Sequence, residues 1–235
     1  MDTQTARLIL PATVDAMPSP ALAVVHAALP ATSSLYRWAK RALDVGISVV
    51  ALALALPLFL VIAAVVRLTS RGPALFRQSR IGRDGQEFNV LKFRSMCRDA
   101  EARLNDLGLY DTYVATGYKL PVAEEFRVTK VGRFLRRTSL DELPQLLNVL
   151  GGSMSLVGPR PVVPSELASY GDLVHCYLSV RPGITGMWQV NGRSHVQFPE
   201  RAHFDRDYFH GRSLRLDLAI LARTPLAVLR GNGAY

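Results

Sequence analysis

The most pronounced pattern in the chain is a run of uncharged, mostly apolar residues over positions 45–66. As a helix this run would be about 33 Å long, enough to cross the hydrocarbon core of a bilayer. Basic residues flank both ends, with Arg37, Lys40 and Arg41 before the run and Arg67, Arg71, Arg77, Arg80 and Arg83 after it. Because positive charge is retained on the cytoplasmic side of a membrane, this symmetry indicates that both ends stay in the cytoplasm.

Two arrangements of the apolar run are open, a straight transmembrane span and a re-entrant hairpin. Pro57 lies near the middle of the run, where it would break or kink a helix. Each arm of a broken helix would reach only about half-way through the hydrocarbon core. We therefore favour a monotopic membrane protein in which residues 34–70 form a re-entrant helix–break–helix with its break at Pro57.

The next pattern, over residues 74–94, alternates as a β-hairpin does and contains an Asp84-Gly85 turn. On its second strand Lys92 and Arg94 share one face, because side chains two positions apart in a strand point the same way. The two cations have two interpretations, a binding site for a common anion or ordinary solvated charges.

Two further stretches have helical periodicity. Leucines recur at helical spacing over residues 139–150, and Gly151-Gly152 follows as a stop. Residues 213–229 form an amphipathic pattern, bent at Pro225 and too charged to span a bilayer, which indicates a helix lying on protein or at the membrane interface. Together with a helical start to residues 97–118, these patterns predict a mainly α protein with a small β-hairpin (α+β).

The leucine-faced helix has two possible starts, and both involve the acidic pair Asp141-Glu142. Ser139 with Glu142 fits a capping box. Asp141 as the N-cap would instead place Pro144 within the first turn, where proline is tolerated. In both cases the two carboxylates lie at a helix N-terminus, a position that favours anions and phosphate groups.

Composition narrows the function classes. The chain has 235 residues, with 28 Lys and Arg against 19 Asp and Glu, a net charge of +9 and 49% hydrophobic residues. A basic excess with high apolarity suits an anionic membrane surface, whereas the long uncharged run argues against a nucleic-acid-binding protein. Cys97, Cys176 and the five histidines show neither metal-ligand spacing nor a disulfide framework, so we expect no zinc site.

The candidate chemistry lies at Asp141-Glu142 and the arginines around it. Arg136 precedes the pair, and three rigid loops that follow carry Arg160, Arg181 and Arg193. One such arginine is a surface charge as readily as a ligand, but three on stiff loops favour bidentate phosphate recognition. An acidic pair among cations suits phosphoryl transfer, in which one carboxylate attacks phosphorus and the other binds Mg²⁺. A simple helix cap is the alternative for the pair.

The order of motifs along residues 37–235 resembles the bacterial sugar transferase family, the monotopic polyprenyl-phosphate phosphoglycosyl transferases. The chain looks most like the compact, exopolysaccharide-initiating undecaprenyl-phosphate galactose or glucose phosphotransferases, although Leu56 stands where family members often have Ser. The motifs are Lys40-Arg41-x-x-Asp44, Gly72-Pro73-Ala74-Leu75-Phe76-Arg77-Gln78, Lys92-Phe93-Arg94-Ser95-Met96, Arg136-Arg137-Thr138-Ser139-Leu140-Asp141-Glu142-Leu143-Pro144-Gln145, Ser155-Leu156-Val157-Gly158-Pro159-Arg160-Pro161, Arg181-Pro182-Gly183-Ile184-Thr185-Gly186 and Gln189-Val190-Asn191-Gly192-Arg193.

The resemblance implies Mg²⁺ dependence and a covalent intermediate. Asp141 would be the nucleophile that attacks the sugar-linked phosphate of a UDP-sugar and releases UMP, and Glu142 would bind the metal. Undecaprenyl phosphate would then accept the hexose phosphate, as the first step of exopolysaccharide repeat-unit assembly. The candidate phosphate-binding residues are Lys92, Arg94, Arg136, Arg160, Arg181 and Arg193.

The resemblance also implies a setting. We expect a disordered tail over residues 1–33, the membrane hairpin over residues 34–70, and a catalytic domain over residues 71–235 on the cytoplasmic face of the bacterial inner membrane. The expected partners are a UDP-sugar, undecaprenyl phosphate and inner-membrane lipids, with a homodimer as an option and no nucleic acid. The competing hypothesis is a non-catalytic, basic, membrane-bound scaffold for polysaccharide assembly.

Overall fold

The computed structural model describes residues 33–109, 126–192, 196 and 198–229. Three sequence predictions lie wholly or mostly outside these residues: the disordered tail, the irregular end of the 97–118 segment, and Arg193. Thr32–Tyr235 groups as one compact unit.

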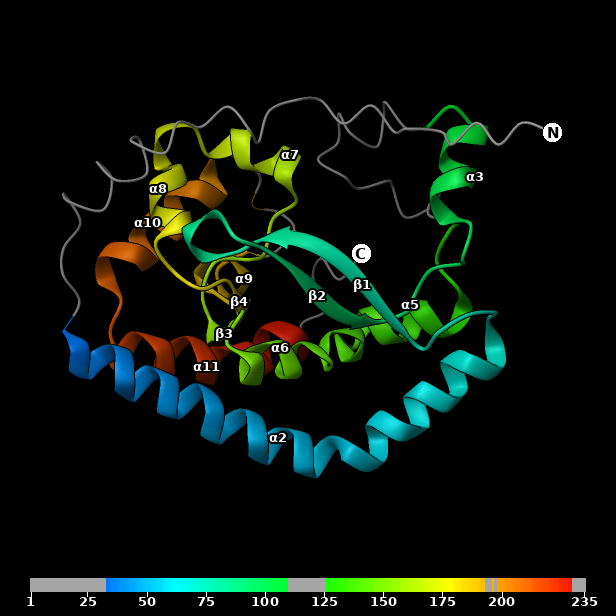
Figure 1. The fold of residues 1–235 in the computed structure, drawn as a ribbon, viewed down its shortest axis with the longest axis horizontal. Coiled ribbons are helices and arrows are strands. Elements are labelled where there is room, and N and C mark those ends of the chain that lie inside the picture. The colour runs from blue at the N-terminus through cyan, green and yellow to red at the C-terminus, as the bar shows by residue number, and fades with distance from the viewer. Residues whose placement is uncertain (1–32, 110–125, 193–195, 197, 230–235) are drawn as a thin grey trace. The chain divides into compact units, whose positions relative to one another are not determined.

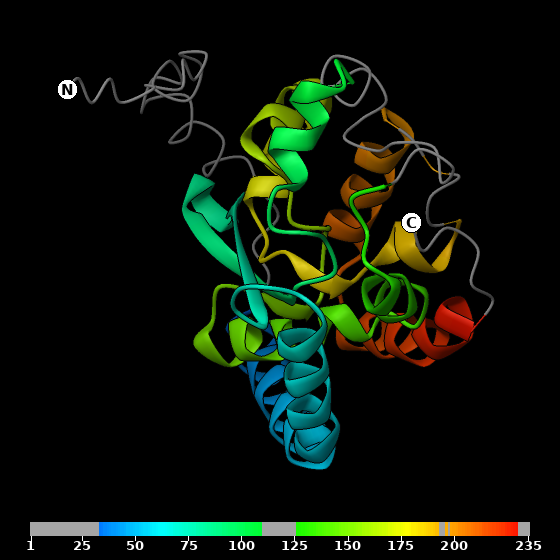
Figure 2. The same ribbon diagram turned by 90° about the vertical axis from the view of Figure 1, so that its right-hand side faces the viewer.

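The described residues are mostly helical and contain two small sheets, so the mainly α fold class is confirmed. Figures 1 and 2 show α2 along one side of the unit, with the strands and the other helices on the opposite side of it. In chain order the elements are α2 (Ser34–Thr69), β1 (Leu75–Ile81), the 3₁₀ turn η1 (Arg83–Gly85), β2 (Glu87–Phe93), α3 (Ala100–Asp106), α5 (Lys130–Arg137), the 3₁₀ turn η3 (Leu140–Glu142), α6 (Gln145–Gly151), β3 (Ser155–Val157), α7 (Pro164–Leu167), the 3₁₀ segment η4 (Ala168–Leu173), α8 (Val174–Leu178), β4 (Gly183–Thr185), α9 (Met187–Val190), α10 (Glu200–Gly211) and α11 (Leu214–Leu229).

The apolar run forms α2, a continuous helix of 36 residues that contains Pro57. The predicted break at Pro57 is therefore corrected: the helix continues through the proline, and Figure 1 shows its axis bending near the middle. Proline removes one backbone hydrogen bond and crowds the preceding turn, which kinks a helix without ending it when long helical arms flank the site. Within the described part of the chain, α2 is the one helix that is long and apolar enough to cross a membrane.

Polar residues attach the first half of α2 to the rest of the unit. Asp44 is 2% exposed and accepts a hydrogen bond from the backbone N–H of Leu156 at 3.0 Å. Lys40 Nζ lies 3.1 Å from Oδ2 of the fully buried Asp217 on α11. Because these buried charges have hydrogen-bonding partners, the contact holds this half of the helix in one defined position.

Apolar side chains attach the second half of α2. Ile62 and Val66 pack in one cluster with Phe93 of β2 and Leu135 of α5. The ring of Phe59 adds a tilted aromatic contact with Phe93, at 4.6 Å between centroids. Both halves of α2 therefore contact the same unit, while side chains between them, such as Leu54 at 79% exposure, are open to the surroundings.

The predicted hairpin and its turn are confirmed. Strands β1 and β2 pair antiparallel, with Leu75 opposite Phe93 and Ile81 opposite Glu87. The turn η1 places Asp84 at φ 60° and Gly85 at φ 75°. These are left-handed conformations, which glycine adopts freely and which aspartate tolerates better than most residues.

A second, parallel sheet was not predicted. Ser155 of β3 lies opposite Gly183 of β4, and Val157 lies opposite Thr185. Each strand has three residues, too few to show a period of two in the sequence. The sheet depends on a close approach at Gly183, where an added Cβ would lie 2.1 Å from the backbone N of Gly158.

The helix predicted at the C-terminal end is confirmed as α11. Asp217 and Ile220 are buried on one face, whereas Leu218 and Leu226 are about half exposed on the other. The helix therefore packs on the unit by one face and presents apolar side chains outward by the other.

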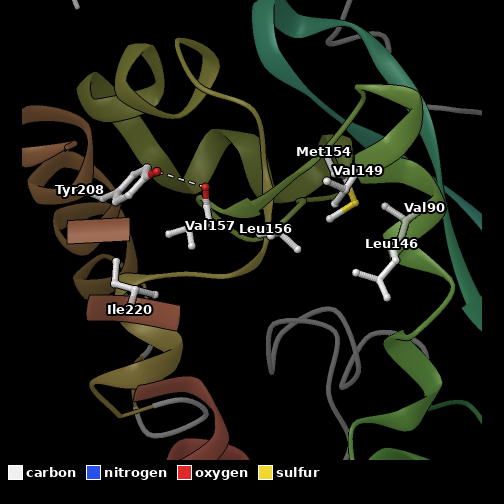
Figure 3. Close-up of a cluster of buried hydrophobic side chains, with 8 residues drawn as sticks. All are labelled: Val90, Leu146, Val149, Met154, Leu156, Val157, Tyr208 and Ile220. Atoms are coloured by element: carbon white, nitrogen blue, oxygen red, sulfur yellow. Dashed lines mark hydrogen bonds between the residues drawn. The ribbon is translucent and has the colours of Figure 1, made fainter. Parts of the chain in front are cut away.

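The largest apolar cluster joins β2, α6, β3, α10 and α11 (Figure 3). Within this cluster, the hydroxyl of Tyr208 donates a hydrogen bond to the Val157 carbonyl at 3.1 Å. Its buried members are Val90, Leu146, Val149, Met154, Leu156, Val157, Tyr208 and Ile220. This cluster places β2 against α6, directly next to the acidic pair.

Candidate active site

The acidic pair forms the second and third residues of the 3₁₀ turn η3, which follows Ser139 and begins at Leu140. Helix α6 begins only at Gln145, with Pro144 as its N-cap, and neither Ser139 nor Pro144 provides a side-chain cap. Both predicted helix starts are therefore wrong, because Pro144 cannot donate the backbone hydrogen bond that would continue the helix. The predicted stop is confirmed, since Gly152 ends α6 at φ 84°.

The turn η3 sends its two carboxylates in different directions. Ser139 has φ 57°, and outside Asp84 no other described non-glycine residue has a positive φ. Asp141 follows as a buried residue with 7% exposure, whereas the Glu142 side chain is 36% exposed. One carboxyl group therefore faces the interior, and its neighbour faces partly outward.

Lys92 of β2 contacts the acidic pair directly. Its Nζ lies 3.1 Å from Oε1 of Glu142, and both side chains are partly exposed. The sequence analysis proposed Lys92 as a phosphate-binding residue, and that role stays a prediction. An ion pair with partial solvent exposure contributes little to stability, so its value lies in fixing where the ammonium group stands.

Arg136, at the end of α5, is the second cation near the acidic pair. Its Nε donates a hydrogen bond to the hydroxyl of Ser95 at 3.0 Å, which fixes the guanidinium near the turn. Its charge is one of two that act favourably on the Asp141 carboxylate, the other being Lys92. A strand cation and a helix cation thus both act on the Asp141 carboxylate.

Opposing forces act on the Asp141 carboxyl group. Burial is the main effect and raises its pKa above the ordinary aspartate value, and the negative charge of Glu142 raises it further. Lys92 and Arg136 act against this increase by stabilising the carboxylate. The net direction is upward, so Asp141 holds its proton more firmly than an exposed aspartate would.

Arg94 does not share an anion-binding position with Lys92. It is 7% exposed, and its Nη2 donates to the carbonyl and hydroxyl oxygens of Ser70, both at 2.8 Å, at the end of α2. Its Nε and Nη1 are buried without a hydrogen-bond partner among the described atoms. Strand β2 ends at Phe93, so the alternation that placed the two cations on one face does not extend to Arg94.

The loop arginines lie in other places. Arg181 donates from Nε to the carbonyl of Gly152 at 2.8 Å, at the end of α6 farthest from the acidic pair. Arg160 lies after β3, near enough to Arg201 for its charge to help lower the pKa of that guanidinium, which burial lowers most. Arg193 lies outside the described residues. A substrate-binding role for these three arginines stays a prediction.

The donor set at η3 fits Mg²⁺ better than a metal that needs a protein cage. In the part of the chain that the structure describes, no group of three or more His, Cys, Asp and Glu side chains could hold a metal. Mg²⁺ commonly binds one or two carboxylates and completes its shell with water and substrate phosphates. The partly exposed Glu142 beside Asp141 offers that kind of site.

Two residues that support the site were missed as functional residues in the sequence. Asn148 of α6 makes hydrogen bonds to β2, and Arg41 of α2 donates to the α6 carbonyls of Val149 and Leu150 at 2.6 and 2.8 Å. Arg41 had a signal, because the Lys40-Arg41-x-x-Asp44 motif precedes the apolar run. Asn148 had none, because its partners lie almost sixty positions earlier in the chain.

Comparison with known proteins agrees with the geometry. A family model described as bacterial sugar transferase matches residues 35–231. The chain belongs to this family. The bacterial sugar transferase match extends from the first turn of α2 to the end of α11, so it includes the acidic pair and each element that contacts it.

Several curated relatives that are similar in sequence to this sugar transferase have informative names. An undecaprenyl-phosphate galactose phosphotransferase of Salmonella typhimurium is 44% identical over 85% of this chain and 42% of its own length. The exopolysaccharide production protein ExoY of Rhizobium meliloti is 44% identical over 84% of this chain and 88% of its own. A UDP-glucose:undecaprenyl-phosphate glucose-1-phosphate transferase of Xanthomonas campestris is 42% identical over 84% and 40%. The chain thus spans less than half the length of the first and third relatives and most of ExoY.

Proposed function

We propose that this protein transfers a hexose 1-phosphate from a UDP-sugar to undecaprenyl phosphate, as the first step of exopolysaccharide repeat-unit assembly. The observation that carries the proposal is the buried carboxyl group of Asp141, on which the charges of Lys92 and Arg136 both act, in a chain that matches the bacterial sugar transferase family over residues 35–231. The names of the Salmonella and Xanthomonas relatives support the same substrates, with galactose or glucose as the sugar.

In the proposed first step, a carboxylate oxygen of Asp141 attacks the phosphorus that is linked to the sugar. A bond forms between that oxygen and phosphorus, the bond to the bridging oxygen breaks, and UMP leaves with the bonding electrons. In the second step, a phosphate oxygen of undecaprenyl phosphate attacks the same phosphorus. The aspartyl–phosphorus bond breaks, which restores the Asp141 carboxylate and leaves a sugar linked to the lipid through a diphosphate.

The residues around Asp141 have separate roles in this proposal. Glu142 would hold Mg²⁺, which when bound would supply positive charge to the phosphate oxygens of the substrate. Lys92 and Arg136 favour the ionised form of Asp141, and their cationic groups suit phosphate oxygens that enter the site. Arg94, Arg160, Arg181 and Arg193 are retained as candidates for contacts with the rest of the nucleotide or with the lipid phosphate.

We further propose that α2 is re-entrant, so that both of its ends lie on the cytoplasmic face of the inner membrane. This proposal is supported by the contacts of both halves of α2 with one unit. A helix that spans the bilayer would place its two ends on opposite sides of the membrane, so its two halves could not both contact that unit. The exposed apolar side chains between the two contact regions would then lie in one leaflet.

An assay of UMP release separates the enzyme from the scaffold hypothesis. The full chain in lipid nanodiscs is incubated with Mg²⁺ and, in turn, UDP-galactose, UDP-glucose and N-acetylated UDP-sugars, with and without undecaprenyl phosphate. We expect UMP release with at least one sugar, and a covalent sugar-phosphate adduct on the protein when the lipid is left out. Folded protein that releases no UMP with any of these sugars would exclude the enzyme and favour the scaffold.

A labelling experiment tests the re-entrant arrangement. Single cysteines replace Trp38 and Arg71, two exposed residues near opposite ends of α2, in a background without Cys97 and Cys176. In intact inverted membrane vesicles we expect a membrane-impermeant thiol reagent to label both sites. Labelling of one site only, with the other site reached after the membrane is opened, would mean that α2 spans the bilayer.

A further inference from the structure

Strand β2 has one edge that β1 does not pair. Among the described strands its sheet contains β1 and β2 alone. On the other edge, the side chain of Asn148 on α6 makes two hydrogen bonds to the strand backbone. Its Oδ1 accepts from the N–H of Leu91 at 2.9 Å, and its Nδ2 donates to the carbonyl of Asn89 at 2.8 Å.

These two bonds are the ones that a residue of a neighbouring parallel strand would make on either side of Val90. The carboxamide of Asn148 therefore takes the place of a missing strand at this edge. The residue is 9% exposed, and Ser153 Oγ holds it further by donating to its backbone carbonyl at 3.2 Å. Of the polar side chains, only an amide supplies one acceptor and one donor in this fixed geometry.

The position of this contact matters for Lys92. Side chains alternate along a strand, so Val90 and Lys92 point to the same side of β2. Val90 packs with Leu146 and Val149 of α6. Two residues farther along the strand, Lys92 contacts Glu142. A shift of β2 by one residue against α6 would turn Lys92 away from the acidic pair.

We infer that Asn148 is a positioning residue for the acidic pair, which acts by holding β2 in the register that brings Lys92 onto Glu142. It touches neither substrate nor the reacting atoms, and its effect on the reaction passes through Lys92. The catalytic consequence rests on the proposed function, whereas the register itself can be measured without any activity.

A double-mutant cycle tests the inference. Asn148→Leu removes both hydrogen bonds at similar volume, and Lys92→Met removes the cation whose position is at issue. The single-turnover rate of UMP release is measured for the wild type, both single variants and the double variant. We expect Asn148→Leu to slow release about tenfold in the wild-type background and less than about twofold when Lys92 is already Met, because residues linked through one contact do not act additively.

The control is Thr224→Val, which removes a hydrogen bond of 2.9 Å between Thr224 and Thr185 in another part of the unit. It should change the rate by the same factor whether or not Lys92 is present. If Asn148→Leu also acts by the same factor in both backgrounds, its effect is a general loss of structure and the inference is overturned.

Backbone hydrogen exchange of residues 89–93 provides a readout that needs no substrate. We expect faster exchange there in Asn148→Leu and unchanged exchange in Thr224→Val. Unchanged exchange in Asn148→Leu would overturn the inference even if Lys92→Met left too little activity to measure. An inactive wild type with faster exchange in Asn148→Leu would instead contradict the proposed function and leave the strand contact established.

Discussion

At the residue scale, Asp141 shows a conflict between what the proposed reaction needs and what stabilises the fold. A carboxylate attacks phosphorus only when it is ionised, yet burial favours its protonated form. Lys92 and Arg136 reduce the conflict without removing it, since the pKa remains raised. If the reaction requires a charged residue that destabilises the fold, removing that charge should make the protein more stable.

Asp141→Asn is therefore expected to abolish UMP release and adduct formation while stabilising the protein. Because the folded-state pKa of Asp141 is raised, its favourable contribution to folding is complete below the unfolded pKa and is lost as pH rises through the folded one. At pH 7.5 we expect the variant to unfold a few degrees higher, for a gain of about 1 kcal/mol. The gain should shrink as pH is lowered, and equal unfolding temperatures at every pH would contradict the burial argument.

Ser139 stores conformational strain directly before the acidic pair, because its φ of 57° is unfavourable for a residue with a Cβ. We expect Ser139→Gly to fold at least as stably as the wild type, since glycine adopts this conformation freely. Ser139→Val should lower the free energy of unfolding by about 1–3 kcal/mol, because a β-branched side chain resists it most. Chemical denaturation measures both, and a valine variant as stable as the glycine variant would show that the turn is not strained.

Single residues were predictable from the sequence where a motif signalled them. Asp141, Glu142 and Lys92 were proposed in this way, and the structure brings Lys92 and Glu142 together, while the roles of all three stay predictions. Asn148 was not found, because a leucine-faced helix shows which positions are buried but not which strand edge an amide will meet. The left-handed Ser139 was missed for a similar reason, since serine is a common residue in turns and caps of every kind.

At the scale of elements, patterns predicted those whose period extends over several turns or residues. The hairpin and α11 are of this kind. The start of α6 was wrong because local capping rules compete there with Pro144, and the β3–β4 sheet was missed because six residues carry too little pattern. The predicted break at Pro57 was wrong because α2 continues through the proline, although Figure 1 shows the helix axis bending near its middle.

Arg41 connects two of these elements, and its removal should loosen α6. The guanidinium donates to the carbonyls of Val149 and Leu150 in the last turn of α6, where the Val149 carbonyl also accepts from the N–H of Gly152 at 3.0 Å. We expect Arg41→Met to lower the free energy of unfolding by about 1–3 kcal/mol, since it removes both side-chain bonds from these partly buried carbonyl groups.

The matched control is Arg37→Met, one turn earlier on the same helix, where the side chain is exposed. It should change stability by less than about 0.5 kcal/mol. Thermal unfolding in nanodiscs, with hydrogen exchange of residues 145–152 as a local readout, measures both variants. Equal effects of the two substitutions would mean that the loss of charge near the membrane matters and that the contact with α6 does not.

At the scale of the whole molecule, some side-chain contacts join segments that lie far apart in the sequence, and these could not be predicted from it. Composition and the flanking charges predicted membrane association, and the family resemblance predicted the chemistry. Neither predicted that the buried carboxylate of Asp217 on α11 would accept hydrogen bonds from Lys40 and from the hydroxyl of Tyr36 on α2. These partners lie about 180 positions apart in the sequence. Such pairings depend on how the elements pack, which no local pattern contains.

The pH dependence of global stability should come largely from one such packed group, Asp205 of α10. This residue is 1% exposed, and its Oδ2 accepts a hydrogen bond of 2.7 Å from the Tyr170 hydroxyl in η4. Burial raises the pKa of Asp205 to about 7, against the favourable effects of the Tyr170 hydrogen bond and the Arg201 charge. Its contribution to stability is therefore complete below about pH 4 and is lost as pH rises through about 7.

Asp205→Asn should consequently flatten the stability curve between pH 5 and pH 7. The amide oxygen can still accept from Tyr170, and no ionisation remains to be suppressed. In the wild type we expect stability to fall by about 1.4 kcal/mol per pH unit between about pH 5 and pH 6.5, because unfolding then releases the proton that folded Asp205 holds, and we expect the slope to fade above pH 7. Asp207→Asn is the control, since that exposed carboxylate pairs with Arg206 on the same helix and should leave the slope unchanged. A wild-type curve that is already flat from pH 5 to pH 7, measured by urea unfolding in nanodiscs, would show that folded Asp205 is ionised throughout that range, with compensation by Arg201 stronger than the effect of burial.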